Sequence, residues 1–330
     1  MRLRSFVTAA LATVLAASAL APAAPATAAT ADRWGFAYVK DPTVPVWTVL
    51  DTSRQWGSWK TAFPAAWADG VKLAPGRFQV RFPQIGASSR GVPHVTPVNR
   101  TGHYCEVVRW FQSGADEIVD VQCHRPGGTR EDTPFTVLWT TSSGVLPAGT
   151  SHAYVQWSSG LMTQSYNSTG VANAVGPLGV GQYLVRLPGV GLADVQVYVF
   201  CYDQAGAFVN TDFVLSYHRR RPVIGSLGPP SYFGYLGTAV GGPTNDNSVL
   251  GVGANTVAPL APAGRYLATF PQIGLKETHA QVVAQGAGSN YCHLTQQWTY
   301  TTNADVDVIC FDNTGAVTPH RFLATFTSRL

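Results

Sequence analysis

The sequence predicts an all-β protein: three tandem β-sandwich-like repeats, Ig-like or jelly-roll-like, behind a cleaved signal peptide, with the middle repeat truncated. Three observations support this prediction. The chain contains copies of itself, short runs of alternating apolar and polar residues are separated by Gly- and Pro-rich turns, and no stretch beyond the N-terminal segment has helical periodicity. We therefore expect repeats at residues 33–141, 151–218 and 231–328.

The N-terminal segment has the pattern of a secretory signal peptide. Arg2 and Arg4 are basic, residues 6–20 are apolar, and residues 26–28 are the small residues of a cleavage site. The apolar run is too short and too rich in Ala to span a membrane. We expect residues 1–28 to be removed and the protein to be extracellular.

Composition narrows the function classes. The 330 residues include 22 Lys and Arg against 18 Asp and Glu, and only 12% of the chain is charged. Such a nearly neutral chain lacks the basic surface that binds nucleic acid. Residues 218–222 form the one basic run, which we interpret as a solvated linker. We expect no nucleic-acid partner and no membrane insertion, and the oligomeric state stays open.

The repeat is read from matching motifs. Residues 76–86 return 188 residues later as residues 264–274, and a third copy lies at residues 181–191. From the proline of this motif, a closing cysteine follows after 40 residues in the first copy and 39 in the third. In the middle copy the interval is only 13 residues. An insert of about two strands and one cysteine is therefore missing from the middle copy.

Each copy opens and closes with an aromatic-rich strand. The expected opening strands are residues 34–39, 152–157 and 232–236, and the closing strands are residues 135–139, 213–217 and 322–326. Between them, runs such as residues 78–82 alternate apolar with polar side chains, which is typical of half-buried strands. We expect six or seven strands in each full copy, in a topology that the sequence does not fix.

Five cysteines fit an exported protein. Cys105 and Cys123 are separated by 18 residues, as are Cys292 and Cys310, at matching places in the repeat. We expect the disulfides Cys105–Cys123 and Cys292–Cys310; the competing use, a zinc site, lacks the usual ligand spacing. Cys201 matches the second cysteine of each pair and should be a buried free thiol, with an intermolecular disulfide or a reactive thiol as alternatives.

Tryptophans are concentrated in the first copy, where five of the nine lie within residues 34–67. The third copy has no tryptophan in its corresponding stretch, so residues 47–69 are an elaboration of the first copy. Flat rings that carry one N–H donor suit the apolar faces of sugars. The candidate binding residues are Trp47, Trp56, Trp59 and Trp67; the alternative is that some of these rings fill the core. Trp110 and Trp298 are expected in the core or against the disulfides.

Residues that could carry catalysis have structural explanations. Asp116, Glu117 and Asp120, or Asp305 and Asp307, could form an acid–base pair of the glycosidase kind. Asp120 and Asp307, however, share one repeat position between core valines, which favours an outward strand face. The turns at residues 203–206 and 312–315 could hold Ca²⁺, but their Asp and Gly positions also suit β-turns. We expect no catalytic residue, no metal and no cofactor.

The opening strand, the Gly-x-Tyr/Phe-x-Val-x-Phe-Pro motif, the Val-x-Val-x-Cys-x-Asp-x-x-Gly turn and the closing strand together resemble repeats of secreted actinobacterial proteins of uncharacterised function. The resemblance implies secretion and a β-sandwich module, and no catalytic residue comes with it. We expect a non-catalytic binding protein that recognises polysaccharide or a cell-surface glycan. The alternatives are a secreted hydrolase with its site between repeats, and a protein-binding or inhibitor module.

Overall fold

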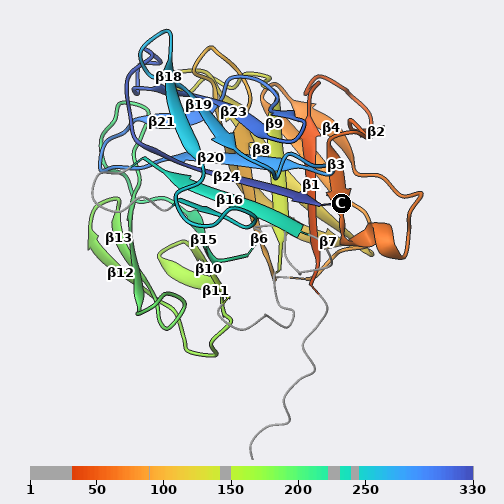
Figure 1. Cartoon of the computed structure of the whole chain (residues 1–330), viewed down its shortest axis with the longest axis horizontal. Helices are drawn as coiled ribbons and strands as arrows, with labels where there is room; N and C mark the ends of the chain where they lie inside the picture. The colour runs from red at the N-terminus through yellow and green to blue at the C-terminus, as the bar shows by residue number, and fades with distance from the viewer. Residues whose placement is uncertain (1–31, 89, 142–149, 222–230, 239–244, 330) are drawn as a thin grey trace, which may run out of the picture.

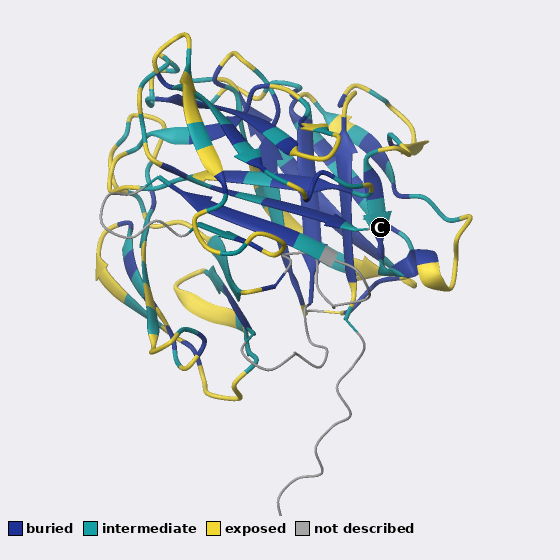
Figure 2. Ribbon diagram, viewed as in Figure 1, coloured by how far each residue is buried: buried dark blue, intermediate teal, exposed yellow. Residues whose placement is uncertain are grey.

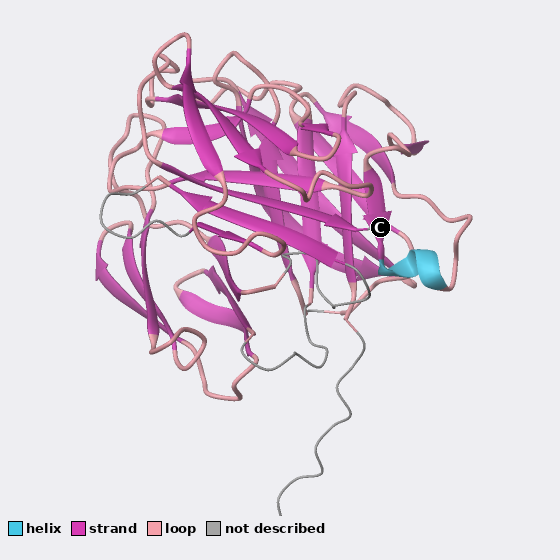
Figure 3. Cartoon of the chain, viewed as in Figure 1, coloured by secondary structure: helices cyan, strands magenta, loops and turns pink. Residues whose placement is uncertain are grey.

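A computed structural model describes residues 32–88, 90–141, 150–221, 231–238 and 245–329 of the chain. The prediction of an all-β fold is confirmed: in the described residues every element is a strand except one short 3-10 helix, η1 (Ser58–Thr61) (Figure 3). The predicted signal peptide and most of both inter-repeat linkers lie outside the described residues. Among the helices of the described part, none is long and apolar enough to cross a membrane.

The strands form six antiparallel sheets, which occur as three pairs along the chain. Unit 1 pairs the sheet β3-β1-β9-β6 with the sheet β2-β4-β5-β8-β7. Its strands are β1 (Trp34–Val39), β2 (Thr48–Val49), β3 (Gln55–Gly57), β4 (Asp69–Ala74), β5 (Arg77–Phe82), β6 (Val92–Pro97), β7 (Tyr104–Ser113), β8 (Asp116–His124) and β9 (Phe135–Thr140).

Unit 3 has nearly the same plan. It pairs the sheet β17-β16-β24-β20 with the sheet β18-β19-β23-β21, and β22 also pairs with β23. Its strands are β16 (Ser231–Gly237), β17 (Asn245–Asn247), β18 (Thr256–Leu260), β19 (Arg265–Phe270), β20 (His279–Ala284), β21 (Tyr291–Leu294), β22 (Thr299–Tyr300), β23 (Ala304–Phe311) and β24 (Phe322–Arg329). Units 1 and 3 thus have more strands than the sequence predicts, because very short strands leave no alternating pattern.

Unit 2 has only three strands in each sheet, in the orders β11-β10-β15 and β12-β13-β14. Its strands are β10 (Ser151–Ser158), β11 (Leu161–Asn167), β12 (Ala174–Gly179), β13 (Gln182–Leu187), β14 (Val195–Phe200) and β15 (Phe213–Arg219). Compared with unit 1, unit 2 lacks counterparts of the short edge strand β2 and, between β13 and β14, of β6 and β7. Two strands are therefore missing where the sequence predicts the loss of an insert (Figure 1).

Each unit encloses its own apolar core between its two sheets. In unit 1 the core contains Val80, Phe82, Val119 and Val121, all buried. The core of unit 3 is built in the same way and includes Phe270 and Phe326. That of unit 2 is smaller, and most of its packing residues, such as Val197 and Val199, are only partly buried. A sandwich with fewer strands covers less of its own interior.

A second apolar layer joins the units. All six residues of β1 and all six of β9 are buried, so this sheet faces protein on both sides (Figure 2). Its outer face carries Trp34, Phe36 and Leu138, which pack against Phe233 and Tyr235 of unit 3. Units 1 and 3 therefore share an apolar interface, and Tyr38 and Val98 of unit 1 also belong to the core cluster of unit 3.

Unit 2 contacts unit 1 through histidine rings. His152 stands opposite His218 in the pairing of β10 with β15, at the position that Trp34 holds in unit 1 and Phe233 in unit 3. The two imidazole rings lie 4.4 Å apart, centroid to centroid. His94 of unit 1 completes the contact, since its Nε2 lies 2.8 Å from the Oγ of Ser216. The interface between units 1 and 2 thus contains a histidine cluster, in which His152 is fully buried.

Three matching turns also bring the units together, one turn from each unit. The turns end at Gly128, Gly206 and Gly315, which all have positive φ angles. A β-carbon on Gly128 would overlap the side chain of Gln204 in unit 2; one on Gly206 would crowd Asn313 in unit 3, and one on Gly315 would overlap Pro126 in unit 1. The contacts run from unit 1 to unit 2, to unit 3 and back to unit 1. This cyclic order indicates an approximately threefold arrangement of the units.

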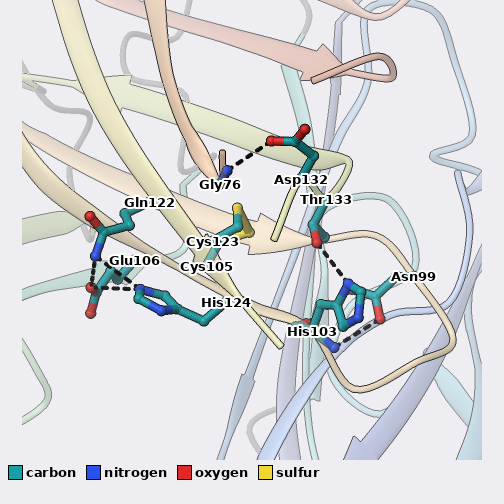
Figure 4. Close-up of a disulfide and its surroundings, with 10 residues drawn as sticks. All are labelled: Gly76, Asn99, His103, Cys105, Glu106, Gln122, Cys123, His124, Asp132 and Thr133. Carbon is teal, nitrogen blue, oxygen red and sulfur yellow. Dashed lines mark hydrogen bonds and ion pairs between the residues drawn. A yellow bond between two sulfur atoms is a disulfide. The ribbon is translucent and has the colours of Figure 1, made fainter. Parts of the chain in front are cut away.

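Both predicted disulfides are present, Cys105–Cys123 between β7 and β8 and Cys292–Cys310 between β21 and β23. Their cysteines stand directly opposite each other on the paired strands. Figure 4 shows the first disulfide beside His124, whose Nε2 lies 3.4 Å from Glu106 Oε1. Cys201 is a buried free thiol, as predicted.

The interface histidines predict that the fold is sensitive to acid. His279 lies at the interface of units 1 and 3, where its Nδ1 is 3.0 Å from Thr136 Oγ1. Burial lowers the pKa of His94 to about 4 and that of His279 to about 3, and lowers the pKa of His152 and His218 as well. Unfolded histidines titrate near pH 6.5, so the unfolded chain takes up more protons below that pH. Stability should be fully present above about pH 6.5 and fall as the pH drops toward 4, by up to about 1.4 kcal/mol per pH unit for each histidine.

Two carboxyls act in the opposite direction, since burial raises the pKa of Glu117 to about 8 and that of Glu277 to about 7. They offset part of the loss of stability that the histidines cause at low pH. The test therefore compares how steeply the free energy of unfolding changes with pH in the wild type and in a variant. Urea unfolding at about pH 7, 6 and 5 should give a shallower pH dependence for His94→Gln than for the wild type. An unchanged slope in the variant would contradict the prediction.

Candidate functional site

The candidate segment, residues 47–69, runs from the edge strand β2 through β3 and η1 to β4. The structure places its four candidate tryptophans in three different environments. Trp59 lies in the core, Trp56 and Trp67 surround Lys60, and Trp47 lies on the surface beside Arg81. The four rings therefore do not form one continuous platform.

Trp59 is a core residue. It is 2% exposed, its ring centroid lies 6.0 Å from that of Phe82, and its Nε1 donates to the carbonyl oxygen of Ala66 at 3.1 Å. A β-carbon on Gly57 would overlap the Trp59 ring. The segment needs glycine at that position because the Trp59 ring occupies the space that a β-carbon would fill. For Trp59, core packing is the explanation that the structure supports.

Trp56 and Trp67 enclose a cation that belongs to the chain itself. The Nζ of Lys60 lies 3.0 Å from the ring centroid of Trp67 and 5.5 Å from that of Trp56. The same ammonium donates to the carbonyl oxygens of Pro64 at 3.0 Å and Ala66 at 2.6 Å. Burial lowers the pKa of Lys60. These cation–π contacts use ring surface that a ligand would otherwise need.

Trp47 is the candidate that remains accessible. It is 40% exposed, and the guanidinium carbon of Arg81 lies 4.6 Å from its ring centroid. Arg81 is held by Asp69, which stands opposite it on the neighbouring strand and accepts from its Nε at 2.8 Å. Asp116 lies 3.9 Å from the same nitrogen. We call Trp47, Arg81, Asp69 and Asp116 the Trp47 patch.

The Trp47 patch is peculiar to unit 1. Strand pairing places Thr256 and Thr269 of unit 3 at the positions of Asp69 and Arg81. In unit 2 the same positions hold Ala174 and Arg186, so the arginine is present without its carboxylate. The exposed side chains of Val46 and Val49 flank Trp47 in the chain. An exposed aromatic ring with an ordered ion pair beside it thus occurs at one of three related places.

The same segment also fastens unit 1 to unit 3. The guanidinium carbon of Arg54 lies 4.4 Å from the ring centroid of Tyr300 and 5.6 Å from that of Trp298. Its Nη1 lies 3.5 Å from the Oγ1 of Thr278, and burial lowers its pKa. No sequence motif marks this contact, since its partners are more than 200 residues away. Part of the elaboration is therefore structural.

Two of the carboxylates considered for acid–base chemistry, Asp120 and Asp307, form ion pairs with arginines. The expectation that Asp120 faces outward is wrong in one respect: its side chain is fully buried beneath Arg77 and Arg109, whose nitrogens lie 3.3 Å and 2.7 Å from its Oδ2. Asp307 forms the equivalent ion pair with Arg265. In these pairs the arginine side chains cover the carboxylates from solvent.

Glu117 lies in the interior of unit 1. It is fully buried, its Oε2 accepts from the backbone N–H of Ala87 at 3.2 Å, and burial raises its pKa to about 8, so it is largely protonated at neutral pH.

A pocket of about 510 Å³ lies in unit 3, away from Glu117. The described residues that line it, such as Tyr266 and His320, include no carboxylate.

In the two Asp turns, the aspartate side chain accepts hydrogen bonds from backbone N–H groups of the same turn. Asp312 Oδ1 accepts from the backbone N–H groups of Thr314 at 2.9 Å and Ala316 at 3.0 Å, and the Thr314 hydrogen bonds lower its pKa. Asp203 makes the same turn, with Ala205 and Ala207 as donors. Across the described ranges, no three His, Cys, Asp and Glu side chains gather as a metal-binding group. The geometry of these turns fits their structural explanation.

Comparison of the chain with protein-family models, with curated proteins and with solved structures gives no match. The functional argument therefore depends on the geometry of the molecule.

The different environments of Trp59 and Trp47 predict effects of very different size on stability. Trp59→Ala should lower the free energy of unfolding by about 3–5 kcal/mol, because it leaves a cavity in the core of unit 1. Trp47→Ala should change it by less than about 1 kcal/mol, because the ring is largely at the surface. Denaturant unfolding of both variants measures this difference, and equal losses would contradict the placement of the two rings.

The contact of Arg54 with Tyr300 predicts energetic coupling between units 1 and 3. A double-mutant cycle with Arg54→Ala and Tyr300→Ala should give an interaction free energy of about 1 kcal/mol, because the guanidinium is partly desolvated over the ring. Chemical denaturation of the four proteins provides the cycle. Arg54→Ala combined with Leu192→Ala serves as the control, since Leu192 is 95% exposed and should not couple.

Proposed function

We propose that the protein is a secreted, non-catalytic binding protein that recognises polysaccharide or a cell-surface glycan through the Trp47 patch. The single observation that carries the proposal is the accessible Trp47 ring beside an Arg81 that Asp69 holds in place. A sugar offers apolar C–H faces to such a ring and hydroxyl groups to the neighbouring charged atoms. Arg81 donates hydrogen bonds, and Asp69 and Asp116 accept them.

The environment of Arg81 supports a preorganised surface. Its hydrogen bond to Asp69 raises the pKa of the guanidinium, so the cation and its position are both stabilised. A side chain that is already ordered loses less conformational freedom when a ligand binds. The restriction of the patch to unit 1 is further support, because residues that all units share are explained by the scaffold.

Two further observations support the extracellular location and the lack of catalytic activity in this proposal. Both disulfides suit an oxidising compartment, in agreement with the signal peptide that the sequence predicts. The carboxylates Asp120 and Asp307 are engaged in ion pairs with arginines, which suits scaffold roles better than proton transfer.

The proposal predicts that retention on glycans depends on Trp47. The mature protein should be retained on at least one insoluble polysaccharide or on isolated cell envelopes, and Trp47→Ala should weaken retention about tenfold or more, because one stacked ring contributes a large share of a small binding surface. Arg81→Lys should also weaken it, since lysine keeps the charge without the planar, two-pronged geometry. Depletion from solution by each matrix measures the effect.

Phe208→Ala is the matched control, since Phe208 is 40% exposed like Trp47 but lies in unit 2. It should leave retention unchanged. Equal retention of wild type and Trp47→Ala, or no retention of the wild type on any matrix, would overturn the proposal.

A further inference from the structure

The second sheet of unit 2 lacks the edge strand that lies beside β8 in unit 1 and beside β23 in unit 3. In unit 1 the order runs β5-β8-β7, and in unit 3 it runs β19-β23-β21, but in unit 2 it stops at β13-β14. In the described structure β14 is therefore an edge strand at a position that is internal in the other two units. The outer backbone groups of an edge strand are available to pair with another strand.

The register of the vacant position is fixed by the cysteines. The backbone N–H of Cys201 donates to Gly181, as Cys123 does to Gly76 and Cys310 to Gly264. Cys201 thus occupies the place that carries a cross-strand disulfide in units 1 and 3. Its missing partner belongs to the strand that unit 2 lacks.

The side chains of β14 show the same incomplete cover. Val119 and Val121 of β8 are fully buried, whereas their counterparts Val197 and Val199 of β14 are only partly buried. Tyr198 is 57% exposed. Of the 18 large apolar side chains exposed in the described structure, eight belong to unit 2, the smallest unit, whose strands β11 and β12 carry much exposed surface (Figure 2).

We propose that the edge of β14 binds an extended segment of another secreted protein, which adds to the sheet as an antiparallel strand in the place that β7 and β21 fill in units 1 and 3. Backbone hydrogen bonds would supply affinity, and alternate apolar side chains of the segment would cover Val197 and Val199. This surface is distinct from the Trp47 patch and goes beyond glycan binding.

The chemistry of the segment follows from the strands that fill this place elsewhere. In unit 1, Val107 stands opposite Val121 and Cys105 opposite Cys123. A matching segment therefore alternates apolar residues and places a small side chain or a thiol opposite Cys201. A second copy of this chain fits less well, because full antiparallel pairing of two β14 strands would bring Asp194 opposite Cys201.

A peptide with the sequence of residues 102–113, which includes β7, tests the proposal on the full mature protein. Its cysteine is activated as a mixed disulfide with 2-thiopyridine. The thiolate of Cys201 attacks the peptide sulfur, a new disulfide forms, and pyridine-2-thione leaves with the electron pair of the broken S–S bond. Reaction should be about tenfold faster than with a scrambled peptide that carries the same activated cysteine, because strand pairing aligns the two sulfur atoms.

Hydrogen exchange gives a readout that does not depend on the thiol. With an unactivated peptide whose cysteine is replaced by serine, the amides of β14 should exchange more slowly, while those of β12 at the opposite edge should not change. Cys201→Ser should abolish the cross-link and keep this protection. Trp47→Ala should keep both, so failure here is separable from failure of glycan binding.

Two results would overturn the inference. One is equal reactivity of the matched and scrambled peptides with no protection of β14. The other is a dimer of the protein alone, detected by light scattering, in which β14 is already protected, since a second copy would then be the occupant.

Discussion

The structure depends on the burial of the β1–β9 sheet on both faces. One face lies on the core of unit 1, and the other presents Trp34, Phe36 and Leu138 to unit 3. A single sandwich would expose this second face to water, at a cost of roughly 25 cal/mol for each square ångström of apolar surface. Units 1 and 3 are therefore parts of one cooperative body, because each covers an apolar surface that the other presents.

Unit 2 contacts unit 1 through polar groups instead of apolar rings. Its interface positions carry His152 and His218 where unit 1 has an aromatic ring and a threonine, and His94 approaches from unit 1. Imidazoles pack well while neutral and poorly once charged, because a buried charge without a partner is expensive. The interpretation of residues 218–222 as a solvated linker is wrong for Arg221, which is fully buried with Asp32 3.7 Å away as its ion-pair partner. His218 and Arg219 belong to β15. Polar groups thus dominate this interface, whereas apolar rings together with the Arg54 contact join units 1 and 3.

Much of the scaffold could be predicted from the sequence, because the signals are local or repeated. Alternation identified the longer strands, and the matching spacing of Cys105 and Cys123 with Cys292 and Cys310 gave both disulfides. The very short strands were undercounted, since two or three residues carry no periodicity. The candidate site could be located but not resolved: Trp47, Trp56 and Trp59 look alike in sequence. Their roles are set by Lys60, Arg81 and the core, and the contact of Arg54 with unit 3 spans most of the chain.

The occurrence of the Trp47 patch in unit 1 alone has a consequence for avidity. A symmetric trimer of separate chains would present three equal sites to a polymeric surface, and binding at one would raise the effective concentration at the others. A single chain with diverged units presents one such patch. Under the proposed glycan binding, one chain would hold a polymer through a single contact and would be released by a single dissociation event.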